Sequence, residues 1–373
     1  MEFSEERSLG VRVLDFGIFL PITNNGWVIS HASPQFSPSF AMNKHVSLHA
    51  EDLGFRFAFS MVKWRGFGGE FGYWDEALES LTLMAGLASV TSRIELIGSL
   101  QPLTLHPVVA ARMALTIDNI SNGRFGVNLV GGSNRDEYAQ MGLWPGDSYY
   151  NERYDHLSEW AEIVTDLWES GSSSRQGRYY HVDDCRLRPR PVRKPRPTII
   201  SAGMSERGIQ FAVRHADASF VAGFDLAATK DLAARVHAAA ASTGRDIKCY
   251  GTYTIIGAPT DQEANERLRR FDDAVDRDTL AKIGRHVRED VGTGATMKEV
   301  DRRVVTRGSS IFSPSLVGSP ETIVEQFRCL VEETELDGVM LTFPDWYEDF
   351  ESFGNDVVPR LQREGLMADG GSL

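Results

Sequence analysis

The stretch of sequence that decides the fold covers residues 94–130, IELIGSLQPLTLHPVVAARMALTIDNISNGRFGVNLV. It begins and ends with short runs rich in aliphatic and aromatic side chains, at Ile94–Ser99 and Phe125–Val130. A segment with helical patterning at 106–119 separates the two runs. A strand, a helix and a second strand in succession predict two parallel strands that are joined by a helical crossover.

The same alternation extends over nearly the whole chain of 373 residues. Eight strand–helix units predict an α/β fold, a single (β/α)8 barrel domain over 1–373, of the longer kind that carries insertions. The other strands are expected at Val13–Leu20, Phe55–Ser60, Thr198–Ala202, Ala218–Ala222, Cys249–Ile256 and Gly338–Thr342, and the other helices at 40–53, 75–90, 150–170, 204–214, 226–242, 260–288 and 320–334.

A doubly wound sheet is the competing architecture, and it usually carries a glycine-rich phosphate loop after its first strand. Residues 20–27, which follow the first expected strand, are LPITNNGW, and no G-x-G-x-x-G motif or Walker loop occurs in the chain. The barrel is therefore the preferred prediction.

Two connections are too long for a plain barrel. The segment 171–197, after the fourth helix, contains Tyr179 and Tyr180 between flanks rich in Pro and Gly, and we expect a small hairpin insertion there. The segment 258–319, after the seventh strand, ends in a stretch rich in Gly, Ser and Pro. Because long excursions at this end of a barrel often cover the binding site, we expect this second insertion to form a lid.

The composition excludes several classes of protein. Hydrophobic residues make up 42% of the chain and charged residues 24%, as in globular proteins, and 52 acidic against 39 basic residues disfavour a nucleic-acid partner. No apolar run is long enough to span a membrane, and an acidic start argues against a signal peptide, so we expect a cytoplasmic protein. The three cysteines are far apart, and His45 and His49 lack a third ligand, so we expect no metal site.

Barrel enzymes place their chemistry at the C-terminal ends of the strands, so the residues there are the candidates. The Gly-rich loop 60–69 carries Lys63, which could approach an anion or an electron-rich ring, or could be an ordinary solvated lysine. Ser99 and Asn128 end the third and fourth strands. The Asn128 amide could both donate to and accept from the edge of a planar ring, or could merely cap the strand.

Two further segments hold candidate residues. Glu137 lies in segment 134–147, whose alternative interpretation is a surface loop that caps a helix. Gly203, Met204 and Ser205 precede a helix after the fifth strand, where free backbone N–H groups and the helix dipole favour a phosphate. An ordinary helix cap at Ser205 is the alternative there. No G-x-S-x-G elbow or Cys/His nucleophile pair supports a hydrolase.

Four motifs together carry a resemblance to a known family: NNGW at 24–27, SMVKWRGFGG at 60–69, SNGRFGVNLV at 121–130 and YAQMGLWPGD at 138–147. They resemble the pyrimidine monooxygenases of the Rut uracil-degradation pathway, over nearly the whole chain. These belong to the bacterial-luciferase-like superfamily of flavin-dependent barrel enzymes. The resemblance implies reduced FMN from a separate NAD(P)H:FMN reductase, dioxygen and a small-molecule substrate as partners, and a homodimer or tetramer.

The resemblance also assigns site residues. Ser99 and Asn128 would hold dioxygen beside the flavin and, with Lys63, form the catalytic set. Whether dioxygen adds at flavin C4a or N5 is left open by the residues, and the resemblance favours N5. The resemblance places FMN contacts on Val62, Lys63, Asn128, Glu137, Arg153, Tyr154 and Ser205. Their positions at strand ends and before the helix add Met61 and Ser99 for the ring and Gly203 and Met204 for the phosphate.

Two departures from the family pattern affect the expected substrate. Ser99 stands where the relatives have Thr, and Gly131-Gly132-Ser133 stands where they have Thr-Gly-Trp, which opens space of about one indole ring. We expect a two-component FMN-dependent monooxygenase that oxygenates a cyclic amide or N-heterocycle with ring opening. A sulfone or haloaromatic monooxygenase, a deazaflavin-dependent dehydrogenase and a flavin-binding protein without turnover remain the alternatives.

Overall fold

The structure, a computed structural model, describes residues 12–70, 72–132, 134–289 and 308–368. Eight parallel strands close into a barrel in the order β9-β11-β1-β2-β3-β4-β7-β8, and β8 pairs with β9 to complete the circle. The predicted (β/α)8 barrel is therefore confirmed. The barrel strands are β1 Asp15–Phe19, β2 Phe57–Ser60, β3 Glu95–Leu100, β4 Phe125–Leu129, β7 Thr198–Ser201, β8 Ala218–Val221, β9 Lys248–Gly257 and β11 Gly338–Thr342.

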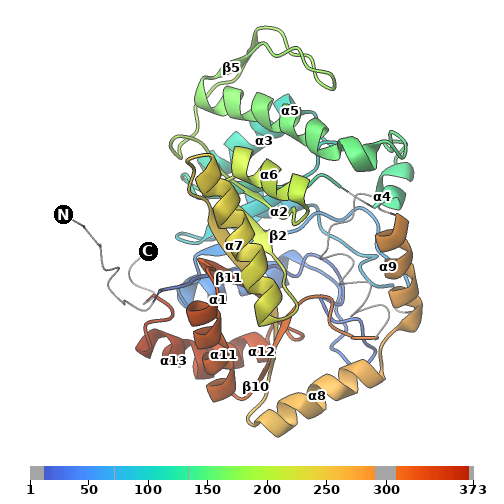
Figure 1. The fold of residues 1–373 in the computed structure, drawn as a ribbon, viewed down its shortest axis with the longest axis vertical. Helices are drawn as coiled ribbons and strands as arrows, with labels where there is room; N and C mark the ends of the chain where they lie inside the picture. The colour runs from blue at the N-terminus through green and yellow to red at the C-terminus, as the bar shows by residue number, and fades with distance from the viewer. Residues whose placement is uncertain (1–11, 71, 133, 290–307, 369–373) are drawn as a thin grey trace, which may run out of the picture.

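Helices surround the barrel and cover its outer surface (Figure 1). The apolar faces of these helices and the outward-facing strand residues form the main hydrophobic core. The barrel interior has a core of its own, which is largely aromatic and includes Phe57, Phe59, Phe220 and Tyr250. The surrounding helices are α1 Phe40–Asp52, α2 Ser80–Ala88, α3 Pro107–Ile120, α5 Tyr149–Glu169, α6 Glu206–His215, α7 Leu226–Ser242 and α11 Pro320–Glu333.

The register of the strands decides which side chains reach the C-terminal end of the barrel. Phe59 and Ile97 belong to the interior core, and side chains two residues apart on a strand point to the same face. Met61 and Ser99 therefore occupy the next interior positions toward the C-terminal end. Asn128 on β4 is the register partner of Ser99 on β3.

The prediction of one helix over 260–288 is wrong, because the segment forms two helices, α8 Asp261–Asp273 and α9 Arg277–Glu289. Val275 forms an antiparallel bridge with Ser30, whose Oγ donates to the carbonyl oxygen of Phe271 at 2.7 Å. The carboxylate of Asp276 then accepts from the backbone N–H groups of Asp278 and Thr279, at 3.0 and 3.1 Å. An aspartate in this position caps a new helix, so the chain restarts at α9.

Both long connections contain strands in their described parts. A short antiparallel ribbon, β5 Ser172–Ser173 with β6 Cys185–Arg186, lies within 171–197 and beyond α5 in Figure 1. The sequence analysis did not anticipate β10, Ser315–Gly318, which pairs in parallel with β9 and extends the sheet. Residues 290–307 of the expected lid lie outside the described residues.

The sequence patterns predict no helix or strand in the C-terminal segment after β11. It forms α12 Glu348–Ser352, a π-helical turn η2 Phe353–Val357 and α13 Val358–Arg363. None of the helices in the described ranges is both long enough and apolar enough to cross a membrane.

Candidate active site

Ser99 and Asn128 form a buried hydrogen-bonded pair at the C-terminal end of the barrel. Asn128 Nδ2 donates to Ser99 Oγ at 2.9 Å, and Ser99 Oγ donates to the backbone oxygen of Ser60 at 2.7 Å. The two residues are only 2% and 3% exposed, respectively. Asn128 Oδ1 is buried and has no hydrogen-bond partner among the described residues. A buried acceptor without a donor is costly, so the site is suited to a ligand that carries an N–H or O–H group.

Lys63 and Glu137, from the segments that follow β2 and β4, form a buried ion pair. Lys63 Nζ donates to Glu137 Oε1, and the two side chains are 7% and 5% exposed. Lys63 Nζ also lies 4.4 Å from the centroid of the Phe67 ring. The alternative interpretation of Lys63 as a solvated loop residue is therefore excluded, and the opposite charges of Lys63 and Glu137 offset each other.

Glu137 reaches this position from a short helix, α4 Arg135–Ala139, which Asn134 caps by accepting from the N–H of Asp136. Gly132 has φ +71°, and a Cβ at this position would collide with the hydroxyl of Tyr138. Only glycine fits between β4 and α4 at this point. Ser133 lies outside the described residues, so the expected opening at that position has no structural description.

The residues expected at the phosphate end gather around the N-terminus of α6. Ser205 is the N-cap, and its Oγ accepts from Gly208 N at 3.1 Å. A Cβ at Gly203 would lie 2.6 Å from the Tyr154 hydroxyl, and a Cβ at Gly208 would lie equally close. Tyr154 on α5 therefore packs directly against a turn that only glycine permits. The N–H groups of α6, a serine hydroxyl and a tyrosine hydroxyl thus meet in one place.

Arg153 precedes Tyr154 on α5 and approaches the turn after β4. A Cβ on Gly131 would lie 3.5 Å from Arg153 Cδ, and Arg153 is 7% exposed. The Tyr149 hydroxyl on the same helix donates to the backbone oxygen of Gly131. The structure thereby connects the β4 end, which carries Asn128, with the α6 end, which carries Ser205.

The remaining predicted residues lie at or near these two groups. Met61 is half-buried and packs against both the main core and the barrel interior core, and Val62 is half-buried beside it. Met204 Sδ accepts from the backbone N–H of Ala222 at 3.2 Å, which ties the end of β7 to the end of β8.

The sequence analysis missed the residues that hold these side chains in place. Ser80, the first residue of α2, accepts from Ser99 N through its Oγ at 2.9 Å. Trp64 Nε1 donates to Gln101 Oε1 at 2.8 Å, and Gln140 donates to Trp64 O at 2.8 Å. In the sequence, these residues are marked as candidates only by their places just after the strand ends or in segments that face them.

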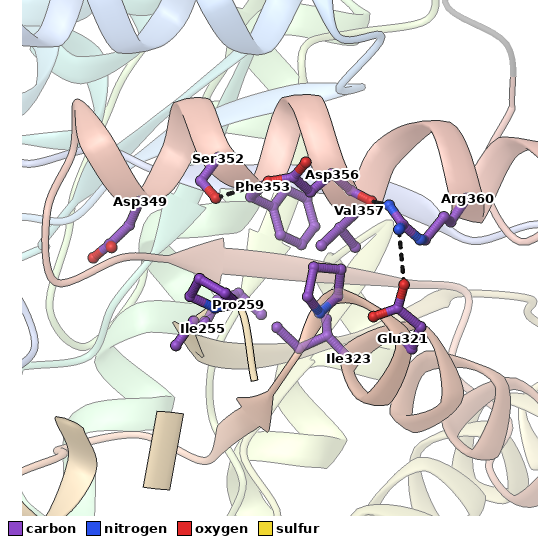
Figure 2. Close-up of a pocket in the computed structure, with 13 residues that line it drawn as sticks. Ile255, Pro259, Glu321, Ile323, Asp349, Ser352, Phe353, Asp356, Val357 and Arg360 are labelled. Atoms are coloured by element: carbon purple, nitrogen blue, oxygen red, sulfur yellow. Dashed lines mark hydrogen bonds and ion pairs between the residues drawn. The ribbon is translucent and has the colours of Figure 1, made fainter. Parts of the chain in front are cut away.

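A lateral cavity of about 300 Å³ lies away from this site, between the end of β9 and the helices α11 to α13. Figure 2 shows Arg360 paired with Glu321 at its rim, at 2.8 Å. Asp349, also in its lining, is paired with Arg267 at 2.6 Å. None of the predicted site residues lines this cavity, so it is separate from the candidate site.

The sequence predicts no metal site at His45 and His49, because a third ligand is lacking. Their rings stack 6.2 Å apart on α1, outside the barrel. Within the described ranges, no three His, Cys, Asp or Glu side chains are grouped as a metal centre would require.

A closed parallel barrel with polar side chains gathered at the C-terminal ends of its strands defines a barrel enzyme that binds its ligand at that end. The family model for luciferase-like monooxygenases matches residues 14–337. The chain therefore belongs to the luciferase-like monooxygenase family, and the prediction of a flavin-dependent monooxygenase is confirmed at the level of the enzyme class.

The chain is similar to pyrimidine monooxygenases named RutA. It is 41% identical to the one from Rhizobium rhizogenes over 94% of this chain and 96% of that protein. It is 43% identical to the one from Methylorubrum populi over 93% of both chains. Among solved structures, riboflavin lyase RcaE, with modified FMN and riboflavin, is similar with a TM-score of 0.84 and 20% identity, over 97% of this chain and 94% of that one.

Proposed function

We propose that the protein is a two-component monooxygenase that uses reduced FMN and dioxygen to oxygenate a cyclic amide or N-heterocycle, with ring opening. The observation that supports this most directly is the buried Ser99–Asn128 pair at the ends of β3 and β4, whose Asn128 Oδ1 has no partner among the described residues. The similarity to pyrimidine monooxygenases over 94% of the chain supports the substrate class. A separate NAD(P)H:FMN reductase and self-association remain predictions from that similarity.

The residues at the site fit FMN chemically. Reduced flavin carries ring N–H donors, which suit the unpartnered acceptor Asn128 Oδ1. The phosphate carries negative charge, which suits the α6 N-terminus, the Ser205 and Tyr154 hydroxyls and the Arg153 guanidinium. The glycines at 203 and 208 leave room for Tyr154 at this turn.

With reduced FMN held by these residues, the cofactor would supply the two electrons that let one atom of dioxygen enter the substrate and the other leave as water. Ser99 fixes the orientation of the Asn128 amide, because the Ser99 hydroxyl is already committed to the Ser60 carbonyl. Asn128 and Ser99 do not titrate near neutrality, so they position reactants rather than remove protons. Lys63 and Glu137 neutralise each other and exclude water from this end of the site.

The test is oxygen uptake and product analysis with reduced FMN supplied by an FMN reductase. The panel holds uracil, other cyclic amides, pyrazines, a dialkyl sulfone and a haloaromatic acid. Oxygen-18 from labelled dioxygen should appear in a ring-opened product of a cyclic amide or N-heterocycle. Substrate-dependent hydride transfer without oxygen consumption would overturn the proposal, and so would label only in a sulfone or haloaromatic product.

A further inference from the structure

Half-buried apolar side chains form a second surface at the C-terminal end of the barrel. Trp27, Met61, Phe67, Phe224 and Phe312 pack against the cluster that includes Tyr73 and Trp74. Two of them, Trp27 and Met61, also pack against the barrel interior core. This surface therefore lies directly on top of the barrel interior, where the strand ends carry the candidate site.

The position of Trp27 is fixed by the loop that follows β1. The backbone oxygen of Gly26 accepts from the Tyr73 hydroxyl at 2.9 Å and from Trp74 Nε1 at 2.6 Å. Gly26 has φ +56°, a conformation that favours glycine. The NNGW motif, which has no role in the proposed cofactor contacts, thus places one indole ring at the end of the barrel.

Phe312 lies far from Trp27 in the sequence but next to it in the structure. Val28 and Ile311 form an antiparallel bridge, and Phe312 N donates to Trp27 O at 3.1 Å. The two rings lie 5.6 Å apart with an interplanar angle of 42°. We call Trp27 and Phe312 the aromatic pair. Because backbone bonds hold both residues, the pair is preorganised.

The exposure of these rings separates them from ordinary core residues. Tyr73 and Trp74 in the same cluster are 0% and 5% exposed, whereas Trp27 and Phe312 are only half-buried. Trp27 and Met61 pack against the same two clusters, and Met61 is a proposed flavin contact. A half-buried aromatic surface that shares these clusters with a proposed flavin contact is suited to the substrate, since ligand sites are mostly apolar with few polar groups.

We propose that Trp27 and Phe312 are specificity-determining residues, against which the planar ring of the substrate packs. The inference rests on the proposed function and specifies how that site selects its substrate. The aromatic pair offers ring faces and edges, and a flat conjugated ring can pack closely against them. The pair therefore favours planar rings over puckered ones. The hydrogen bonds to the amide groups of the substrate come from elsewhere in the site.

The test compares uracil with 5,6-dihydrouracil, which keeps both amide groups but has a puckered, saturated ring. In the parent enzyme, with reduced FMN and dioxygen, kcat/KM should be higher for uracil. Trp27→Leu and Phe312→Leu should each raise KM for uracil by about three- to tenfold and reduce the preference for the planar ring. Because an aromatic surface that packs against the substrate ring contributes to binding, kcat should fall much less.

Phe40→Leu is the matched control, because Phe40 is an exposed aromatic residue, 44% exposed, on α1 outside the barrel. It should leave both substrates unaffected. If the two variants keep the parental ratio for the two rings, or if the parent does not prefer the planar ring, the inference fails. Binding and oxidation of reduced FMN by the parent without substrate are measured in parallel. If the parent neither binds nor oxidises reduced FMN, the proposed function is contradicted instead.

Discussion

At the scale of single residues, the closest link between sequence and site is the Ser99–Asn128 pair. Two residues that end adjacent parallel strands were expected to meet, and they are register partners joined by a 2.9 Å hydrogen bond. The direction of that bond could not be predicted, because it depends on the Ser60 carbonyl, which accepts the Ser99 proton. Ser99 therefore acts in this arrangement chiefly by orienting Asn128.

Asn128→Ala should lower product formation by about a hundredfold or more at saturating reduced FMN. Removal of one preorganised polar group from a site where charge develops has an effect of this size. The fold should survive, because Asn128 Oδ1 has no partner among the described residues and Ser99 Oγ, which loses the Asn128 Nδ2 donor, keeps its own bond to the Ser60 carbonyl. The measurement is product formed per unit of reduced FMN consumed, with circular dichroism as the check on folding.

Ser99 variants test the orienting role separately. Ser99→Ala should act in the same direction as Asn128→Ala, whereas Ser99→Thr keeps the hydroxyl and should retain activity. Parental rates in both alanine variants would show that dioxygen is activated elsewhere.

A second prediction concerns Ser205 and Tyr154 at the α6 N-terminus. The Ser205→Ala, Tyr154→Phe double variant should bind reduced FMN more weakly by about 1–3 kcal/mol, because two donors to a charged group are lost. Anaerobic equilibrium dialysis measures the affinity. Ser39→Ala removes a helix cap of the same kind on α1 and is the control for lost capping. Equal affinities in parent and double variant would remove these residues from the phosphate site.

At the scale of elements, α9 lies next to α4 in Figure 1 and is attached to the loop that carries Lys63. Thr279 Oγ1 donates to the backbone oxygen of Gly68 at 3.1 Å, and Glu70 N donates to Asp276 Oδ2 at 3.1 Å. His286 Nε2 on α9 lies 3.8 Å from the carboxylate of Asp136 on α4, and Asp136 directly precedes Glu137 in the sequence. The helix is thus coupled to both partners of the buried ion pair.

Binding of reduced FMN and substrate should therefore slow amide hydrogen exchange in α9, Arg277–Glu289. The expected effect is roughly tenfold at ligand concentrations well above the dissociation constant, because binding penalises local opening. Thr279→Val, which removes the bond to Gly68, should weaken this coupling. Helix α7 on the outside of the barrel is the internal reference. Equal protection of α9 with and without ligand would rule out the lid function.

Element boundaries show where sequence patterns lose information. The break between α8 and α9 was missed because the apolar spacing continues through it, while the cause, a bridge from Val275 to Ser30, lies far away in sequence. β10 was missed because four residues within a Gly/Ser/Pro-rich stretch give no alternation to detect. In both cases a partner remote in sequence decides the structure.

At the scale of the whole molecule, the barrel could be predicted because eight strand–helix units leave few topologies. The site could be predicted only in outline. Strand ends identified Ser99, Asn128 and Ser205, and the resemblance supplied Arg153 and Tyr154. The aromatic pair could not be predicted, because it depends on the bridge between Val28 and Ile311, which no local sequence pattern indicates.

The burial of histidines makes the stability of the molecule depend on pH. Burial lowers the pKa of His49, His156 and His286, and it lowers the pKa of His215 to about 4, with Arg214 and Arg245 acting in the same direction. His215 Nε2 has no hydrogen-bond partner among the described residues, and its ring lies 5.0 Å from that of Phe211. The folded state therefore holds this ring neutral.

In the unfolded chain a histidine titrates near about 6.5, so below that pH the unfolded state binds more protons than the folded state. The stability that comes from a neutral His215 is complete above about pH 6.5 and is lost as the pH falls toward about 4. Urea unfolding at pH 7.5, 6 and 5 should show this loss. His215→Phe should reduce this loss of stability by about 1 kcal/mol at pH 5, about half of the full linkage value, because solvent screens the half-buried ring.

The half-buried residues His49, His156 and His286 leave some dependence of stability on pH in the variant, because the pKa of each is lowered and each acts with the same sign. His181→Phe exchanges an exposed histidine and controls for the change in composition. Carboxylates in the unfolded chain titrate near about 4, at the end of this window, and burial raises the pKa of Asp118, so that carboxyl acts with the opposite sign. If His215→Phe and the parent lose stability equally between pH 6.5 and 5, the neutral ring at the end of α6 is not what ties folding to pH.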